Sequence, residues 1–156
     1  MTTKIIFFIT LISYSIIVSQ SFMYILALKD TQLNLQAGPY TEVRKLIDSA
    51  MRSNFKYVIY AALLANLLLV ISTLKNPGSI VFITAMIGFV ALVADILLTL
   101  KGNLPINDII NTWTVDNLPA NWTEYRTKWF TVFQYRQVAN ITGFVSLLAG
   151  ALFGSK

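Results

Sequence analysis

The chain has 156 residues, of which 56% are hydrophobic and only 12% are charged, and its net charge is +5. Soluble domains usually carry about 25% charged residues, so this chain has too few charges to cover a water-facing surface. It contains no cysteine and no histidine, which excludes disulfides, thiolate metal sites and histidine-ligated haem made by this chain alone. We therefore predict no metal and no cofactor. The basic residues are too dispersed to predict a nucleic-acid surface.

Long apolar blocks predict an integral membrane protein. A membrane-spanning helix needs about 20 apolar residues, and the blocks reach that length. The expected spans cover residues 5–28, 57–74, 80–100 and 123–153. The first block follows Lys4, as a signal peptide would, but it is longer than a typical signal core, so we expect a retained span. The fold class is thus all-α, a four-transmembrane-helix bundle in which residues 1–156 form a single membrane domain.

A helix is also expected at residues 40–56, before the second span. Its apolar residues recur at helical spacing, and charged residues share the opposite face. The apolar positions are Val43, Leu46, Ile47, Ala50, Met51 and Phe55, and the charged ones are Lys45, Asp48, Arg52 and Lys56. We interpret the helix as a water-side extension of the second span. The alternative is a helix that binds the membrane surface or a partner.

The segment between the third and fourth spans is too polar to cross a membrane and is broken by Pro105 and Pro119. Residues 103–107 predict a compact turn, and residues 108–113 predict a short helix at the membrane interface. Trp113 and Trp122 suit the lipid headgroup level, where aromatic rings are enriched.

Two polar residues interrupt the second and third spans. Asp95 is the acidic residue inside an apolar block, and a charge there should face the bundle and find a partner. Arg126 and Arg136 are the candidate partners. Asn66 is expected to hydrogen-bond to a neighbouring helix, with contact to a ligand as the alternative.

The fourth span carries a polar and aromatic stripe. Its residues are spaced by three, four, three and four, so they share one helical face: Arg126, Trp129, Phe133, Arg136 and Asn140. The stripe extends over roughly 20 Å at the usual helical rise. Because lipid would not accept two arginines and an asparagine, the stripe must face the bundle interior or a wet cavity. Further along, Gly143, Ser146 and Gly150 predict close helix packing.

The distribution of basic residues predicts an orientation. With four spans, both termini and the Lys75 loop lie on one side, and most Lys and Arg residues lie on the other. The positive-inside rule then places loops 29–56 and 101–122 in the cytoplasm and the termini outside. We expect a bacterial inner membrane, with the lipid bilayer as the main partner.

Two motifs resemble a known family. An Asn-x-Pro-x-Asn turn follows the third span, and an Arg-x-x-Trp-x6-Arg pattern enters the fourth. The matching residues are Asn103, Pro105 and Asn107 in the turn and Arg126, Trp129 and Arg136 in the helix. With the four spans, this order resembles the anthrone-oxygenase-like family of small four-helix membrane proteins. The chain departs from the family pattern at Phe133, where members often carry His or Asn.

The resemblance implies a cofactor-independent oxygenase acting on a hydrophobic aromatic or quinol-like small molecule. For such chemistry, Asp95 is the candidate base, and Arg136 is the candidate group that stabilises the anion. The candidate ligand-binding residues are Asn103, Asn107, Arg126, Trp129 and Asn140. The alternative is a non-catalytic membrane binding or assembly subunit whose polar stripe is structural. A homo-oligomer is compatible with either function, and a transporter is disfavoured because no inverted repeat is visible.

Overall fold

The computed structural model describes residues 2–114 and 116–154. The described chain is helical except for short connections, which confirms the all-α prediction. The α-helices are α1 (Thr2–Met23), α2 (Lys29–Leu33), α3 (Ala37–Ala50), α4 (Lys56–Thr73), α5 (Ile80–Leu98), α6 (Leu104–Asn111) and α7 (Trp122–Phe153). Three five-residue π-helical segments join them, namely η1 (Tyr24–Leu28), η2 (Met51–Phe55) and η3 (Thr99–Asn103).

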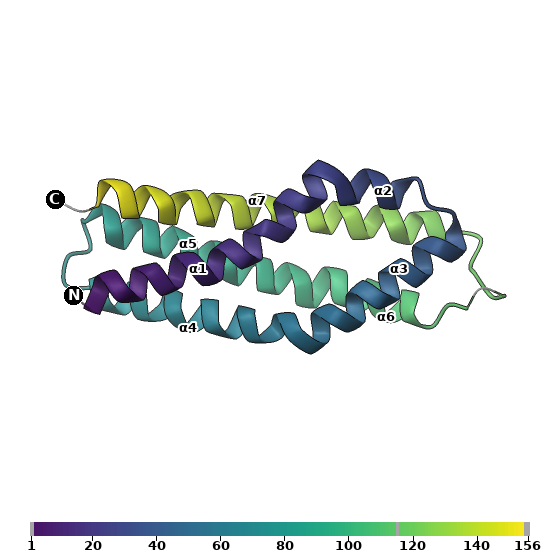
Figure 1. Cartoon of the computed structure of the whole chain (residues 1–156), viewed down its shortest axis with the longest axis horizontal. Coiled ribbons are helices and arrows are strands. Elements are labelled where there is room, and N and C mark those ends of the chain that lie inside the picture. The colour runs from purple at the N-terminus through teal and green to yellow at the C-terminus, as the bar shows by residue number, and fades with distance from the viewer. Residues whose placement is uncertain (1, 115, 155–156) are drawn as a thin grey trace.

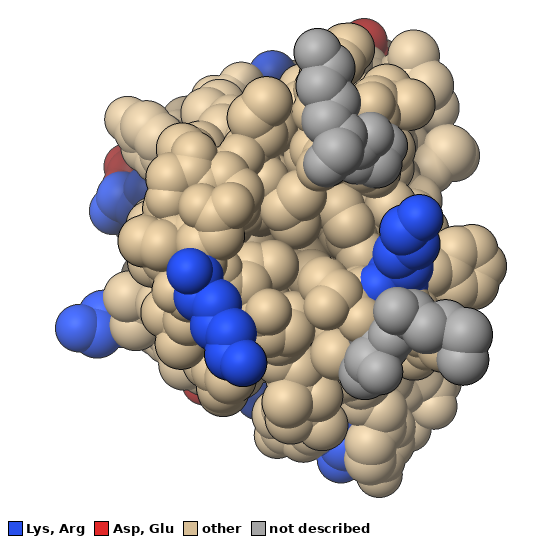
Figure 2. All heavy atoms as spheres, turned by 90° about the vertical axis from the view of Figure 1, so that its left-hand side faces the viewer, with Lys and Arg blue, Asp and Glu red and all other residues tan. Residues whose placement is uncertain are grey.

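The π segments connect the α-helices into long continuous helices, which lie along one axis with α7 (Figure 1). Within the bundle, α1 packs on α4 and α7, and α5 packs on α4 and α7, so that the four helices form a closed ring. Both termini and the α4–α5 connection lie at one end, and the α2–α3 and α6–α7 connections lie at the other. The end with the termini shows mostly uncharged atoms between a few Lys and Arg side chains (Figure 2).

Three of the long helices are apolar enough to cross a membrane: Thr3–Leu33, Ala37–Thr73 and Ile80–Asn111. This supports a membrane protein. The prediction of four spans is not confirmed, because α7 is not among the helices that qualify by composition within the described chain. The physical reason lies in α7 itself, whose polar residues Arg136, Gln137 and Asn140 are buried against the other helices and lower its average hydropathy.

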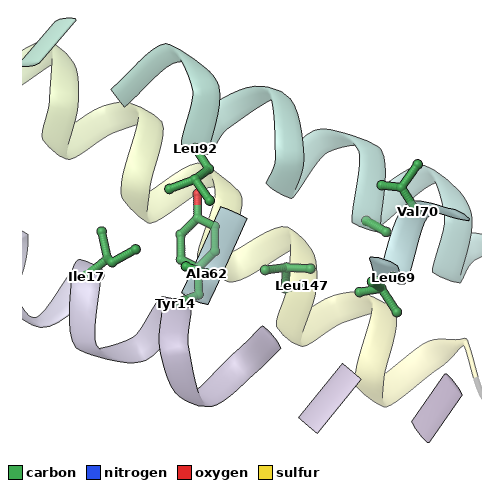
Figure 3. Close-up of a cluster of buried hydrophobic side chains, with 8 residues drawn as sticks. Tyr14, Ile17, Ala62, Leu69, Val70, Leu92 and Leu147 are labelled. Carbon is green, nitrogen blue, oxygen red and sulfur yellow. The ribbon is translucent and has the colours of Figure 1, made fainter. Parts of the chain in front are cut away.

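The apolar core occupies the half of the bundle nearest the termini. Tyr14, Ile17, Leu92 and Leu147 are almost completely buried there (Figure 3). A Cβ atom on Gly143 would come within 2.0 Å of the Tyr14 hydroxyl oxygen, so this glycine is what allows the close approach. The predicted close packing along α7 is therefore confirmed at this position.

The predicted turn at residues 103–107 is wrong. Asn103 ends η3 and Leu104 begins α6, so the helix continues through this motif. Pro105 lies at the start of α6. Because η3 runs directly into α6, this proline removes one backbone hydrogen bond from a continuous helix. The first helix extends beyond the expected end of the first span at residue 28, because α2 continues it to Leu33.

Residues 40–56 match the expected water-side extension only in part, because Arg52 and Lys56 are exposed whereas Asp48 is buried. The polar residues Tyr40, Arg44 and Asp48 of α3 are buried, whereas the side chain of Leu46 is 72% exposed. A helix of a soluble protein turns its apolar face inward, but a helix beside lipid turns its polar face toward the other helices. The predicted helix is confirmed, and the face of α3 that is buried carries Tyr40, Arg44 and Asp48.

The two tryptophans expected at the headgroup level pack on aromatic residues of the protein. Trp113 is buried and packs edge-to-face on Tyr125, with ring centroids 5.4 Å apart. Trp122 is half-buried beside Tyr40, at 5.8 Å between centroids. Trp113 therefore joins the α6–α7 connection to α7, and Trp122 joins the start of α7 to α3.

Candidate functional site

A cavity of about 410 Å³ lies in the half of the bundle that carries the π segments. Pockets for small molecules typically measure about 300–1,000 Å³. One wall comes from α3, η2 and α4, and the facing wall comes from α5, η3 and α6. Gln20 of α1 and Trp129 and Arg136 of α7 complete the lining.

The cavity opens sideways, between the second and third long helices. Tyr60 and Leu100, from opposite walls, are 62% and 55% exposed. Arg52 and Lys56 are exposed lining residues on the same side. The inner end of the cavity, opposite this rim, is called the floor below. Between the rim and the floor, the walls are mainly apolar, and their residues include Ile47, Met51, Phe55, Ile59, Ile96 and Leu104.

An ion pair forms part of the floor. Arg136 Nε donates to Asp95 Oδ1 at 2.7 Å, and both side chains are buried. Of the two arginines considered from the sequence, Arg136 is thus the partner of Asp95. Arg136 Nη1 also donates to Asn103 Oδ1 at 3.1 Å. The pair and Asn103 come from α7, α5 and η3, so the floor joins distant parts of the chain.

Two asparagines extend the polar floor toward α3. Asn103 Nδ2 donates to the Trp129 carbonyl at 2.9 Å, and the Trp129 indole donates to Asn107 Oδ1 at 2.9 Å. Asn107 Oδ1 also accepts from Arg44 Nη2 at 3.1 Å. Its Nδ2 donates to Asp48 Oδ1 at 2.7 Å. Both asparagine side chains therefore use their amide N–H and carbonyl groups to hold η3 and α6 to α7 and α3.

Arg44 and Asp48 are functional-site residues that the sequence reasoning did not identify. Arg44 lies 3.8 Å from the centroid of the Trp129 ring and donates to the Tyr24 hydroxyl at 3.0 Å. Asp48 accepts from Asn107, Asn111 and Arg52 at 2.7 to 2.8 Å. The available signal was the spacing by four of Tyr40, Arg44, Asp48 and Arg52, a second polar stripe beside the one on α7.

The π segments keep residues spaced by four on one face. An α-helix turns once every 3.6 residues, so a strict spacing by four drifts around its axis. The wider i→i+5 turn of a π segment takes up more residues and reduces that drift. Asp95, Thr99, Asn103 and Asn107 consequently all line the cavity across η3. Such segments are frequent at functional sites.

Arg126 does not line the cavity. Its Nη1 donates to the carbonyls of Leu33 and Leu35 at 2.8 and 3.3 Å, and its guanidinium lies 4.5 Å from the Trp122 ring centroid. Leu33 is the last residue of α2, and terminal carbonyls of a helix lack internal partners. Arg126 therefore caps the end of α2, although the sequence stripe suggested ligand binding.

Asn140 and Asn66 are buried outside the cavity lining. Asn140 Oδ1 and both polar atoms of the Asn66 side chain are enclosed without a hydrogen-bond partner in the described part of the chain. The expected bond from Asn66 to a neighbouring helix is thus not made. Of the candidate ligand-binding residues, Asn103, Asn107 and Trp129 line the cavity, as do both candidate catalytic residues, Asp95 and Arg136.

Phe133 is part of an aromatic cluster beside the floor. Its ring stacks on Trp129 with centroids 5.0 Å apart and lies 4.5 Å from the ring centroid of Tyr24. The phenylalanine therefore supports the Trp129 ring from the side away from Arg44 and supplies no polar atom.

In comparisons with known proteins, no protein-family model, no curated protein and no solved structure matches the chain. The resemblance to the anthrone-oxygenase-like family accordingly rests on the two sequence motifs and the expected order of spans.

Proposed function

We propose that this membrane protein binds a hydrophobic aromatic small molecule in the cavity between its second and third long helices. The observation that carries the proposal is the shape and lining of that cavity. The cavity has an apolar passage that opens sideways, and it ends at the floor, where polar side chains are held by hydrogen bonds to one another. Ligand sites in proteins typically combine apolar walls with a few placed polar groups.

The floor could also support chemistry of the kind that the family resemblance implies. Asp95 would accept the proton from an anthrone or its phenolic tautomer, and the adjacent Arg136 cation would stabilise the resulting anion. Dioxygen would then oxidise the ring methylene to a carbonyl, with water as the second product. This reaction requires no resident cofactor.

A non-catalytic binding or assembly subunit is the second candidate. The closed Asp95–Arg136 pair and the complete set of bonds to Asp48 favour it, since both join helices without any ligand. Under this proposal, the polar residues would position the helices, and substitutions at them would change stability rather than activity.

We further propose that α7 completes a four-span bundle in a bacterial inner membrane, with the connections at the cavity end in the cytoplasm and the termini outside. Arg136, Gln137 and Asn140 of α7 are buried against the other helices, so these polar residues would not contact lipid. A homo-oligomer is compatible with this arrangement.

A binding measurement tests the proposal. We expect purified protein in lipid nanodiscs to bind 9-phenanthrol, a three-ring phenol, in equilibrium dialysis. Ile59→Trp fills the apolar passage and should weaken binding at least tenfold. The matched control is Leu64→Trp on the same helix, where the side chain is 58% exposed and away from the cavity. Equal binding by all three proteins would refute the cavity as the site.

Oxygen consumption with anthrone then separates the two candidates. Turnover that Arg136→Gln abolishes, with the protein still folded, would support the enzyme. Binding without turnover would support the non-catalytic function.

A further inference from the structure

Most polar groups that line the cavity already have hydrogen-bond partners among the described residues of the protein, and the few that do not are available to a ligand. Asn103, Asn107, Asp48 and the Trp129 indole have partners for their side-chain polar groups within the bundle. These groups hold helices together, so a ligand would have to displace a protein contact to use them. A ligand is instead recognised by groups that remain uncommitted.

Two uncommitted atoms belong to the ion pair. In the described part of the chain, no group donates to Asp95 Oδ2 and no group accepts from Arg136 Nη2. Neither atom is sealed by its surroundings, in contrast to the enclosed unpaired atoms of Asn66. Since both residues line the cavity, it presents one acceptor and one donor, each belonging to a charged group.

Gln20 supplies the third uncommitted group. Its side chain lines the cavity from α1, and its amide makes no hydrogen bond with the described residues. A polar residue on a spanning helix normally faces other helices to find partners. Gln20 faces the cavity and has found none, so its amide is available to a ligand.

The charges in and beside the cavity balance. Arg44, Arg52 and Arg136 contribute three positive charges. Asp48 and Asp95 of the lining, with Asp108 as the second partner of Arg52, contribute three negative charges. The remaining basic residue of the lining, Lys56, is exposed at the mouth. A carboxylate or phosphate that reached the floor would add an unpaired charge to a poorly solvated site, which is strongly unfavourable.

We propose that the ligand enters from the bilayer as an electrically neutral molecule and presents a hydroxyl group to the floor. The hydroxyl donates to Asp95 Oδ2 and accepts from Arg136 Nη2, while the ring system fills the apolar passage. This inference rests on the proposed function and specifies the polar group and the charge of the ligand. Neutrality also suits a molecule drawn from lipid through an opening rimmed by Tyr60 and Leu100.

Matched phenanthrene probes test the hydroxyl. 9-Phenanthrol is neutral near pH 7, whereas phenanthrene-9-carboxylate is ionised, as phenols and carboxylic acids generally are. 9-Methoxyphenanthrene keeps an acceptor and lacks the donor. We expect the phenol to bind the wild-type protein in nanodiscs at least tenfold more tightly than either analogue. Equal affinity for the carboxylate or for the methoxy compound would overturn the inference.

A charge change at Gln20 tests the balance. Gln20 has no bonding role in the fold, so Gln20→Lys should fold and should add one positive charge to the interior. We expect the ratio of affinities for phenol and carboxylate to fall at least tenfold in Gln20→Lys. Gln20→Leu is the neutral control and should keep the wild-type ratio. An unchanged ratio in Gln20→Lys would overturn the inference.

The two failures are distinguishable. If no phenanthrene probe binds, or if Ile59→Trp has no effect on binding, the cavity is not the site, and both the proposed function and this inference fail. If the probes bind in the cavity without preference for the neutral phenol, the proposed function stands and only the inference fails.

Discussion

At the scale of single residues, the strongest constraint on the molecule is the ion pair between Asp95 and Arg136. The two side chains meet at 2.7 Å and are 1% and 9% exposed. Removing one partner of a buried pair leaves the other charge uncompensated, which costs about 3–5 kcal/mol. Removing both charges avoids that penalty. The pair is therefore expected to behave as a unit.

A double-mutant cycle measures this coupling. Asp95→Asn and Arg136→Gln should each lower the free energy of unfolding by about 3–5 kcal/mol. The double variant should lose less than the sum of the two, because no unpaired charge remains. Unfolding in mixed detergent micelles, followed by circular dichroism, gives the three values. Strict additivity would show that the two residues do not interact.

The sequence predicted some residues of the site and missed others for a definite reason. Asp95 and Arg136 were identifiable because a charge within an apolar block must be paired. Arg44 and Asp48 were missed because they lie in a charged segment that resembled a solvated surface. Arg126 shares the stripe of Trp129, yet its side chain turns to the end of α2. Spacing defines a shared face and does not define which partner each residue reaches.

At the scale of helices, Gly143 is one of the glycines that allow α7 to approach its neighbours closely. A Cβ atom on Gly143 would lie 2.0 Å from the Tyr14 hydroxyl oxygen and 2.9 Å from Ala91 Cβ. Tyr14 has little freedom to withdraw, because its ring is fully buried in the core (Figure 3). A larger residue must push α1 or α5 away from α7.

Gly143→Ala should therefore destabilise the bundle, by about 1–3 kcal/mol as expected for overpacking. Gly38→Ala is the matched control, since no atom lies within 4 Å of the added Cβ in α3. Alanine favours helix over glycine by up to about 1 kcal/mol, so the control should be neutral or stabilising. Thermal unfolding of both purified variants gives the comparison. A stabilised Gly143→Ala would contradict the observed packing.

The helices themselves were largely predictable, and their continuity was not. Apolar blocks identified α1, α4 and α5, because length and composition are sufficient for such segments. The motif at residues 103–107 suggested a turn because it contains Pro105 between asparagines. It is helical because both asparagines find partners across the bundle, in Trp129 and Asp48 among others. Tertiary hydrogen bonds here override the local preference.

At the scale of the whole molecule, the length and packing of α7 favour a fourth membrane crossing. Its 32 residues would extend about 48 Å at 1.5 Å per residue, which exceeds the roughly 30 Å of a hydrocarbon core. It lies along the other helices for the length of the bundle (Figure 1). If α7 packed in this way without crossing the membrane, its neighbours α1, α4 and α5 would have to lie outside the lipid as well, together with their apolar residues.

Cysteine labelling tests the crossing directly, because the natural chain has no cysteine. The probe sites are the α4–α5 connection (Gly78→Cys), the α2–α3 connection (Asn34→Cys), the α6–α7 connection (Ala120→Cys) and a cysteine added after Lys156. In intact bacterial cells, a membrane-impermeant maleimide should label Gly78→Cys and the added cysteine. Asn34→Cys and Ala120→Cys should react only after permeabilisation, because the basic connections are expected in the cytoplasm.

If Ala120→Cys and the added cysteine react under the same conditions, α7 does not cross. If all four sites keep the expected pairing with the two sides exchanged, the four spans stand and only the orientation is reversed.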